Sequence, residues 1–489
     1  MKLSDLLPRE GIYGTISPDS LEIHGVCDHT KKIRSGDLFI VKCGIHTNPL
    51  LFLDEIEEKG AAALLLAEGT PLPRKTELPC FYAQDLAITE AKIWEKYYGD
   101  PAASLRLFAV TGTNGKTSTA KFLSHILNTA NIPTGYIGTL ETTLGGTVIT
   151  DEECTMTTPS ARLLYKRLST LAGLGAQAAV IEVSSHAVVQ KRTALLRFEE
   201  VLFTNLSEDH LDYHGTMEAY FEAKRALFEQ ASLAIINKDD DYGTRLLTTL
   251  PCKTKSIAVI EEADYTAREV YERGTESTQY ECLSPMGAFL IKYPLFGAFN
   301  VYNTLLAVAG AVCAGIGVSD VQRALETLEK PKGRLERISV PAPYTVIIDY
   351  AHTPAAMENA IKAVKRSTKG RLFVLFGAGG EREAEKRPTM GRIACSLAYH
   401  AYITTDNPRG ESQDKIFRDI LSGVGKMENY TVIQDRKTAI CVALASLTTG
   451  DILLLLGKGH EEYLLIGEEK LPFSEREIIR KYFEEKGIQ

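Results

Sequence analysis

The sequence has 489 residues, of which 44% are hydrophobic and 24% charged, as in an ordinary soluble globular protein. One hydrophobic core rarely supports a chain of this length, so we expect several domains. The formal net charge of -8 argues against a surface that binds nucleic acid. The nine cysteines lack paired or metal-type spacing, which is typical of core residues in a reducing cytoplasm.

Neither the N-terminal stretch nor the most apolar stretch of the chain predicts a membrane segment. The N-terminal stretch "MKLSDLLPRE" contains no apolar run, so we expect no secretory signal. The most apolar stretch, Leu305 to Val318, is too short to span a bilayer and predicts a buried helix. We therefore expect a cytoplasmic monomer without membrane insertion.

Apolar strands and helical patterns alternate along most of the chain. Residues 1–98 contain short strand-like runs such as "GDLFIVKCG" between polar turns. Residues 99–331 alternate strands with helices, which predicts βαβ units and a parallel sheet, and residues 332–489 repeat this pattern. The predicted fold class is α/β with these three domains. Ligands of such sheets bind beyond the carboxyl ends of the strands, where this sequence is polar and rich in glycine.

The stretch "VTGTNGKTS" joins an apolar strand to a helical pattern and predicts a phosphate-binding loop. Its backbone N–H groups and the helix dipole would bind phosphates, while lysine reaches the terminal phosphates and threonine can hold Mg²⁺. The full signature has a glycine where this chain has Val110, so a simple glycine turn remains the alternative. The nucleotide-binding residues predicted here are Gly112, Thr113, Asn114, Gly115, Lys116, Thr117 and Ser118.

Two polar clusters follow other apolar strands of the second region. Glu182 lies in "VIEVSSH" and His210 in "FTNLSEDHLDYHG". At the edge of a P-loop sheet, both positions would converge with Thr117 as candidate Mg²⁺ ligands. The alternatives are a surface carboxylate and an ordinary loop histidine.

Lys224 lies on the apolar stripe of a predicted helix, "GTMEAYFEAKRALFEQ", beside Tyr220, Phe221 and Leu227. Its ammonium could extend past the stripe to water. Alternatively, burial would lower the pKa of the amine and make it available for chemistry near the nucleotide.

The motifs "TGTNGKTST", "EVSSH", "FTNLSEDHLDYHG", "EAKRALF", "GAFNVYN", "DYAHTP", "KRPTMG", "TTDNPRGE" and "GKGHE" follow one another over nearly the whole chain. As an ordered set they resemble the Mur ligase family. The resemblance implies an ATP-dependent amide ligase of cytoplasmic peptidoglycan precursor synthesis. ATP would convert a substrate carboxylate into an acyl phosphate, and an incoming amine would then displace the phosphate. Positioning and charge neutralisation would supply much of the catalysis.

The resemblance also implies roles for single residues. The catalytic residues would be Lys116, Glu182, His210 and Lys224. The ligands of two Mg²⁺ ions would be Thr117, Glu182, His210 and Lys224. Lys224 matches the lysine that carries a carbamate in this family, and the carbamate would help to hold the second ion. The nucleotide contacts outside the loop would be Asn300, Arg334 and Asp349, with helix capping as the alternative for Asn300.

The resemblance implies that the acceptor substrate is UDP-N-acetylmuramoyl-L-alanyl-D-glutamate. Its contacts in the second domain would be Thr157, Thr158, Ser184, Gln190 and Arg192. The first domain would hold the uridine, but here the family's motifs are replaced by Asp28-His29-Thr30 and Asn48-Pro49.

"DNPR" resembles the motif of family members that add meso-diaminopimelate. Diaminopimelate has a distal carboxylate that L-lysine lacks, and the guanidinium of Arg409 is suited to bind it. The implied contacts are Arg382, Asp406, Asn407, Arg409, Gly457 and Glu461. The alternatives are a surface role for Arg409 and L-lysine as the added amino acid.

Two further functions stay open. A ligase resembling folylpolyglutamate synthase would share the P-loop and the carbamylated lysine, but the "GDLF" region and "DNPR" argue against it. A nucleotide-dependent scaffold without chemistry is the other alternative, against which Glu182, His210 and Lys224 argue.

Overall fold

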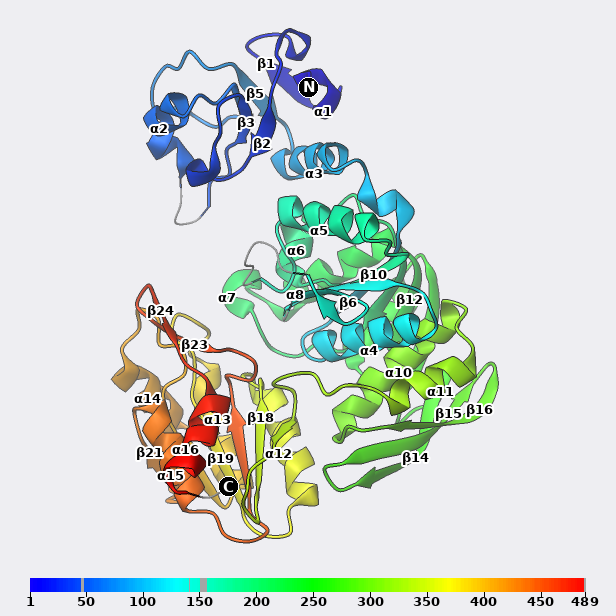
Figure 1. The fold of residues 1–489 in the computed structure, drawn as a ribbon, viewed down its shortest axis with the longest axis vertical. Coiled ribbons are helices and arrows are strands. Elements are labelled where there is room, and N and C mark those ends of the chain that lie inside the picture. The colour runs from blue at the N-terminus through cyan, green and yellow to red at the C-terminus, as the bar shows by residue number, and fades with distance from the viewer. Residues whose placement is uncertain (45–47, 140, 150–155, 488–489) are drawn as a thin grey trace.

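The computed structural model describes residues 1–44, 48–139, 141–149 and 156–487. Three main sheets follow one another along the chain, each flanked by helices (Figure 1). Their strands lie within residues 12–83, 106–293 and 336–456. The predicted α/β class is confirmed, whereas the domain bounds at residues 98 and 331 stay predictions.

The first sheet has the order β1-β5-β4-β3-β2. Its strands are parallel except for β1, which pairs with β5 in the antiparallel sense. The strands are β1 Ile12–Gly14, β2 Gly25–Cys27, β3 Asp37–Ile40, β4 Ala63–Ala67 and β5 Cys80–Ala83. The helices are α1 Leu3–Leu6, α2 Leu53–Glu58 and α3 Leu86–Tyr97, with 3₁₀ turns at Pro18–Ser20, Thr30–Lys32 and Pro49–Phe52.

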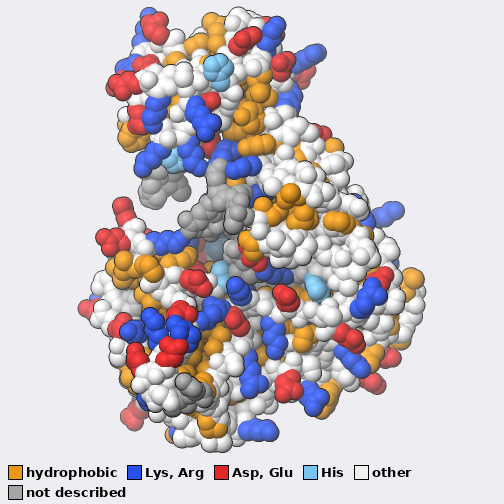
Figure 2. Space-filling model, in the orientation of Figure 1, with side chains coloured by type: hydrophobic (Ala, Val, Ile, Leu, Met, Phe, Trp, Pro, Cys, Tyr) orange, Lys and Arg blue, Asp and Glu red, His pale blue; other side chains and the backbone are white. Residues whose placement is uncertain are grey.

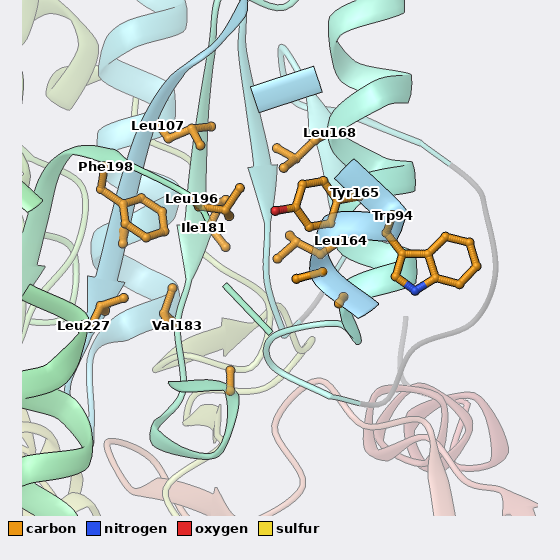
Figure 3. Close-up of a cluster of buried hydrophobic side chains, with 14 of the residues drawn as sticks. Trp94, Leu107, Leu164, Tyr165, Leu168, Ile181, Val183, Leu196, Phe198 and Leu227 are labelled. Carbon is orange, nitrogen blue, oxygen red and sulfur yellow. The ribbon is translucent and has the colours of Figure 1, made fainter. Parts of the chain in front are cut away.

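The helix α3 attaches this first sheet to the central part of the molecule. Its Trp94 belongs to the same buried hydrophobic cluster as Tyr165 and Leu168 of α5 (Ala161–Gly173), as Figure 3 shows. The cluster continues to Leu107 and Phe198 on the central sheet. Burial of these apolar side chains favours a fixed position of α3 against the central region.

The central sheet has the order β16-β15-β14-β13-β12-β11-β6-β10-β7-β8-β9. Neighbours from β7 to β14 are parallel, which confirms the predicted βαβ arrangement. Antiparallel strands, which the sequence did not predict, extend both edges. The strands are β6 Arg106–Thr111, β7 Thr134–Ile137, β8 Thr142–Leu144, β9 Thr147–Val148, β10 Ala178–Glu182, β11 Phe198–Phe203, β12 Ala231–Asn237, β13 Lys253–Ala258, β14 Tyr265–Arg273, β15 Ser277–Ser284 and β16 Gly287–Tyr293.

The helices of the central region include α4 (Lys116–Thr129), which packs against α10 (Ala298–Cys313). The remaining ones are α6 Ser185–Val189, α7 Leu211–His214, α8 Met217–Arg225, α9 Asp241–Thr249 and α11 Val318–Glu326, with 3₁₀ turns at Pro101–Ser104 and Ala226–Gln230.

The apolar stretch from Leu305 to Val318 forms only part of one helix. Its first residues are buried in α10, as predicted, but α10 ends at Cys313. The prediction was wrong at its C-terminal end because Gly315 adopts a φ of 92°, which ends the helix before α11 begins at Val318. Among the helices that the structure describes, none is long and apolar enough to cross a membrane.

The third sheet has the order β17-β18-β22-β19-β20-β21, and only β17 is antiparallel to its neighbour. The carboxyl ends of four predicted strands therefore meet at one edge. The strands are β17 Glu336–Ile338, β18 Thr345–Asp349, β19 Leu372–Phe376, β20 His400–Ile403, β21 Tyr430–Val432 and β22 Ile452–Leu456, followed by the hairpin β23 Tyr463–Ile466 and β24 Glu469–Pro472. The helices are α12 Pro354–Ser367, α13 Lys386–Leu397, α14 Gln413–Ser422, α15 Arg436–Ala445 and α16 Glu475–Glu485.

Half of the described cysteines are buried, as the core role expected from the sequence requires. Cys27, Cys80, Cys282 and Cys395 are buried, and each of the eight cysteines in the described ranges is free. Cys43 is exposed, so the core prediction was wrong there. Cys154 lies outside the described residues.

Candidate active site

A cavity of about 290 Å³ lies where the central and C-terminal sheets face each other. Each of the six residues predicted to bind the added amino acid lines this cavity, and so do eight of the predicted nucleotide and metal residues. The first group is Arg382, Asp406, Asn407, Arg409, Gly457 and Glu461, and the second is Thr113, Asn114, Gly115, Lys116, Thr117, Glu182, His210 and Arg334. The structure therefore brings together residues as distant in the sequence as Thr113 and Glu461.

The P-loop lies between β6 and α4, as the sequence predicted. Gly112 and Gly115 have φ values of 141° and 89°, which favour glycine, and α4 begins at Lys116. A Cβ atom on Gly115 would collide with the side-chain oxygen of Asn303. The Nζ of Lys116 donates to the carbonyl oxygens of Gly112 and Thr113, both at 2.9 Å. The lysine is thus folded back onto its own loop, and burial lowers its pKa.

A second cavity, of about 370 Å³, lies on the other side of the P-loop. Its lining includes Ser118 and Asn303 as well as Asp349 from the C-terminal sheet. Asn114, Gly115, Thr117 and Arg334 border both cavities, so the P-loop forms a wall between them.

Arg334 reaches the P-loop from the segment that leads into the C-terminal sheet. Its Nη2 donates to the hydroxyl of Thr117 at 3.5 Å, and its guanidinium lies 4.9 Å from the ring centre of Tyr350. Asn300 lies deeper in α10, where its amide donates to the carbonyl of Phe296 at 2.8 Å. Gly297 is the N-cap of α10, so the capping alternative for Asn300 was wrong.

Glu182 is fully buried at the carboxyl end of β10, so the alternative of a surface carboxylate was wrong. Its Oε2 accepts from the hydroxyl of Thr117 at 2.9 Å and from that of Thr139 at 3.1 Å. Its Oε1 accepts from the backbone N–H of Thr139 at 3.1 Å and from the hydroxyl of Tyr136. These bonds hold the carboxylate beside the P-loop threonine, an arrangement of oxygen atoms that suits a hard cation such as Mg²⁺.

His210 lies in a strained turn at the mouth of the same cavity, with a φ of 58°. Its Nε2 is 3.5 Å from a carboxylate oxygen of Asp209. Burial disfavours the imidazolium and lowers the pKa of His210 to about 3, even though Asp209 opposes this shift. The neutral imidazole therefore keeps a lone pair that can bind a metal ion.

Lys224 is 1% exposed on α8, so its ammonium does not extend to water and that alternative was wrong. Its Nζ donates to the carbonyl oxygen of Gly112 at 2.9 Å, the same atom that accepts from Lys116, and lies 4.8 Å from the ring centre of Tyr220. Burial and the neighbouring Lys116 hold the pKa of Lys224 well below its ordinary value. This environment favours the uncharged amine over the ammonium.

The residues that the structure describes contain no group of three or more His, Cys, Asp and Glu side chains able to hold a metal ion. The predicted Mg²⁺ ligands include a threonine and a modified lysine, which are not of these types. The adjacent oxygens of Thr117 and Glu182 fit a magnesium ion that takes its other ligands from phosphate and water.

The residues predicted to bind the UDP-sugar dipeptide form one hydrogen-bonded group. Arg192 donates to the carbonyl oxygen of Thr158 at 2.6 Å and to the side chain of Gln190, also at 2.6 Å. The hydroxyl of Thr158 donates to the carbonyl of Glu182 at 2.8 Å and accepts from the backbone N–H of Ser184 at 2.9 Å. Of these residues, Thr157 lines the 290 Å³ cavity, where Thr139 donates to its hydroxyl at 3.2 Å.

The residues predicted to bind the added amino acid supply charges of both signs to the wall of the 290 Å³ cavity that lies opposite the P-loop. Arg409 is half-buried and its Nη1 donates to the carbonyl of Gly380 at 2.8 Å, while Arg382 is exposed beside it. Burial and the nearby Arg382 lower the pKa of Arg409. Asp406 and Glu461 provide carboxylates on the same wall. Two arginines and two carboxylates are complementary to an amino acid that carries both carboxylates and ammonium groups.

Several polar residues of the cavity were not among the predicted site residues. They are Thr139, Asp209, Asp212, Tyr350, His352, Glu383 and Lys386. Glu383 accepts a hydrogen bond from the backbone N–H of Leu211, which follows His210, and thereby joins the C-terminal region to the central one. The clusters around "SEDHLDYHG", "DYAH" and "EREAEKRP" carried a signal for most of these residues, since each follows a strand at the same sheet edges.

In the first domain, two of the family's motifs are replaced by other residues, and these residues cap short 3₁₀ helices. The Nδ1 of His29 accepts from the backbone N–H of Lys31 at 3.2 Å, and the side-chain oxygen of Asn48 accepts from Leu50 at 3.0 Å. Asp28 pairs with Lys42 at 2.8 Å and with Arg162 of the central region at 3.0 Å. These residues thus fix local turns and a contact between regions.

Comparisons with known proteins agree with this site. Residues 110–311 match the Mur ligase middle domain, and residues 333–459 match the "Mur ligase, glutamate ligase domain". A protein of Synechococcus elongatus named UDP-N-acetylmuramoyl-L-alanyl-D-glutamate--2,6-diaminopimelate ligase is 39% identical over 94% of both chains. A relative of the same name from Listeria innocua is 33% identical over 99% of both. A solved structure under this name has 28% identity and a TM-score of 0.66 over 97% of both chains. The chain therefore belongs to the Mur ligase family of ATP-dependent ligases.

Proposed function

We propose that this protein joins meso-diaminopimelate to UDP-N-acetylmuramoyl-L-alanyl-D-glutamate at the expense of ATP, as a monomer in the cytoplasm. The observation that carries the proposal is the 290 Å³ cavity, in which the P-loop lysine and threonine face the six residues expected to bind diaminopimelate. The names of the relatives support the same substrates. Formation of an amide requires these two groups of residues to share one space, because the amine must reach the activated carboxylate.

In the proposed reaction, the γ-phosphoryl group of ATP is transferred to the D-glutamate carboxylate, and ADP leaves. The amine of diaminopimelate then attacks the acyl carbon, which forms the amide bond and releases phosphate. Lys116 would bind the transferred phosphoryl group once it leaves its two carbonyl partners on the loop. Arg334, which already contacts Thr117, would add a second positive charge at this position.

We further propose that Thr117, Glu182 and His210 hold Mg²⁺, which neutralises the charge of the phosphates when bound. The hydrogen bond of 2.9 Å between Thr117 and Glu182 supports this assignment, because it places two hard oxygen ligands together.

Lys224 would carry a carbamate. A buried ammonium with Lys116 as a close positive neighbour is costly, and the low pKa favours the free amine that reacts with carbon dioxide. The product would place a carboxylate on Lys224 near Lys116 and the P-loop. This carboxylate would pair with the ammonium of Lys116 and supply a further oxygen for Mg²⁺.

The diaminopimelate pocket would use its charges in pairs. Arg382 and Arg409 would bind carboxylates, and Asp406 and Glu461 would bind ammonium groups. The UDP-sugar would approach through the hollow between the N-terminal part and the rest of the molecule, whose rim carries Lys and Arg side chains (Figure 2). Positive charge at this rim suits a diphosphate.

One assay distinguishes the proposed reaction from two alternatives. L-lysine would leave Arg409 without a distal carboxylate to bind, and a folate substrate would leave the pair of arginines without a diamino acid. The assay measures phosphate release with ATP, Mg²⁺ and UDP-N-acetylmuramoyl-L-alanyl-D-glutamate, with either meso-diaminopimelate or L-lysine. Release with diaminopimelate supports the proposal, release with L-lysine alone would correct the amino acid, and no release with either would refute the ligase reaction proposed.

A further inference from the structure

The side-chain amide of Asn407 is held in one orientation. Its Oδ1 accepts from the Nζ of Lys458 at 2.7 Å and from the backbone N–H of Leu465 at 3.0 Å. An amide oxygen has two lone pairs, so these two donors occupy it fully. Its Nδ2 donates to Oε2 of Glu461 at 2.9 Å, and Glu461 is the one acceptor that the described part of the chain gives to Nδ2. The remaining group that Asn407 can offer to a ligand is therefore an N–H.

Lys458 is fully buried behind the cavity wall. It donates to Asn407 Oδ1 at 2.7 Å and to Glu461 Oε2 at 3.0 Å, and its Nζ lies 5.2 Å from the ring centre of Tyr463. Asn407 and Glu461 thus accept hydrogen bonds from the ammonium, and the three partners stabilise its positive charge inside the protein. The lysine therefore contacts two pocket residues without lining the pocket itself.

The hairpin that follows Lys458 links Asn407 to Arg409. The N–H of Leu465 on β23 donates to Asn407, and the carbonyl oxygen of Leu465 accepts from the N–H of Arg409 at 3.0 Å. Lys458 and β23 thus contact the "DNPR" segment on the side away from the cavity and hold the side chains of Asn407 and Arg409 at the cavity.

A rotated amide at Asn407 would be disfavoured. The NH₂ group would then face the ammonium of Lys458 and the N–H of Leu465, so that donors would face donors in place of the present hydrogen bonds. The oxygen would at the same time face the carboxylate of Glu461. Both changes oppose rotation, so the pocket presents a donor at this position. A donor attracts a carboxylate and does not attract an ammonium group.

We propose that Lys458 is a positioning residue that fixes the polarity of Asn407 and thereby favours an amino acid with a distal carboxylate over one without it. This inference rests on the proposed function, because it explains the choice of diaminopimelate over L-lysine. Loss of Lys458 frees the amide to rotate and leaves Glu461 without its buried cation. Recognition of the amino acid then weakens while ATP binding does not.

The test compares Lys458→Met with wild type, using the KM for meso-diaminopimelate, the KM for ATP and the ratio of kcat/KM between meso-diaminopimelate and L-lysine. We expect the KM for diaminopimelate to rise at least tenfold, the KM for ATP to change less than twofold and the ratio to fall at least tenfold. Lys470→Met is the matched control, since Lys470 lies 4.6 Å from the same Tyr463 ring but is exposed on β24. It should leave each of these values unchanged.

A double-mutant cycle separates positioning from a general loss of structure. In an Asn407→Ala background, Lys458→Met should have less than a third of its effect on selectivity, because the amide that it orients is absent. Full additivity would overturn the inference. If Lys458→Met does not fold, Asn407→Asp replaces the donor by an acceptor and should lower the selectivity ratio at least tenfold, and an unchanged ratio would overturn it.

The outcomes also separate this inference from the proposed function. A wild-type protein that prefers diaminopimelate, with a Lys458→Met variant of equal selectivity, would refute the role of Lys458 alone. A wild-type protein that uses only L-lysine or neither amino acid would refute the choice of substrate and this inference together.

Discussion

Glu200 on β11 is a buried carboxyl group whose ionisation should set the pH dependence of stability. Its side chain is 1% exposed, and its Oε2 has no hydrogen-bond partner among the described residues. Burial and the adjacent Glu199 raise its pKa to about 9, while Arg106 opposes this shift only in part. The folded protein therefore holds a proton on Glu200 at neutral pH, whereas the unfolded chain releases it.

The substitution Glu200→Gln should stabilise the protein. Since the folded pKa lies above the ordinary value of 4.5, the contribution of this group becomes less favourable as the pH rises from 4.5 to about 9. At about 1.4 kcal/mol per pH unit, the penalty is about 3 kcal/mol at pH 7. Glutamine resembles the protonated acid in shape and carries no such penalty.

Thermal and urea unfolding of wild type and Glu200→Gln would measure this difference. The gap in free energy of unfolding should grow from about 1 kcal/mol at pH 5.5 to about 5 kcal/mol at pH 8.5. Glu276→Gln, at an exposed carboxylate in the turn after β14, is the control and should show no such growth. A gap for Glu200→Gln that stays constant over this pH range would refute the reasoning.

Three further variants test the active site. Lys224→Ala should abolish ligase activity, which a small added carboxylic acid should partly restore in a phosphate-release assay, and full activity without that acid would contradict a carbamate. Arg409→Ala should weaken diaminopimelate binding about a hundredfold in calorimetry, as expected for a bidentate charged pair, and equal losses for ATP would show that the pocket is assigned wrongly. Gly115→Ala forces a strained φ of 89° and a collision with Asn303, so the Kd for ATP should rise at least tenfold, and an unchanged Kd would argue against this geometry.

Local sequence patterns were sufficient for the P-loop and for the buried position of Lys224, whereas the residues of the C-terminal wall were named from the resemblance to the Mur ligase family. The strand, glycine turn and helix around Lys116 are encoded by neighbouring residues, and the apolar stripe around Lys224 identified a buried face. The order of motifs then supplied Arg409 and Glu461, which line the cavity as expected. Such features depend on residues close in sequence or on a motif that the family shares.

Buried cations were not predictable in this way. Arg436 is 1% exposed and pairs with Glu475 at 2.7 Å, and Arg387 is buried with Glu411 at 2.6 Å. The partners of these arginines lie 39 and 24 residues away, and a charged residue without a known partner is normally placed at the surface. The antiparallel strands β14 to β16 were not predicted either. Their side chains alternate between a buried and an exposed face, and no helix separates one strand from the next as in a βαβ unit.

The wall that the P-loop forms between the two cavities has a consequence for inhibition. The cavities of about 290 and 370 Å³ share Asn114, Gly115, Thr117, Arg334, Tyr350 and His352, and their other lining residues differ. Two small compounds, one in each cavity, could bind at the same time. ATP must place its phosphates at the wall itself, so it would compete with both compounds, whereas diaminopimelate would compete with only one.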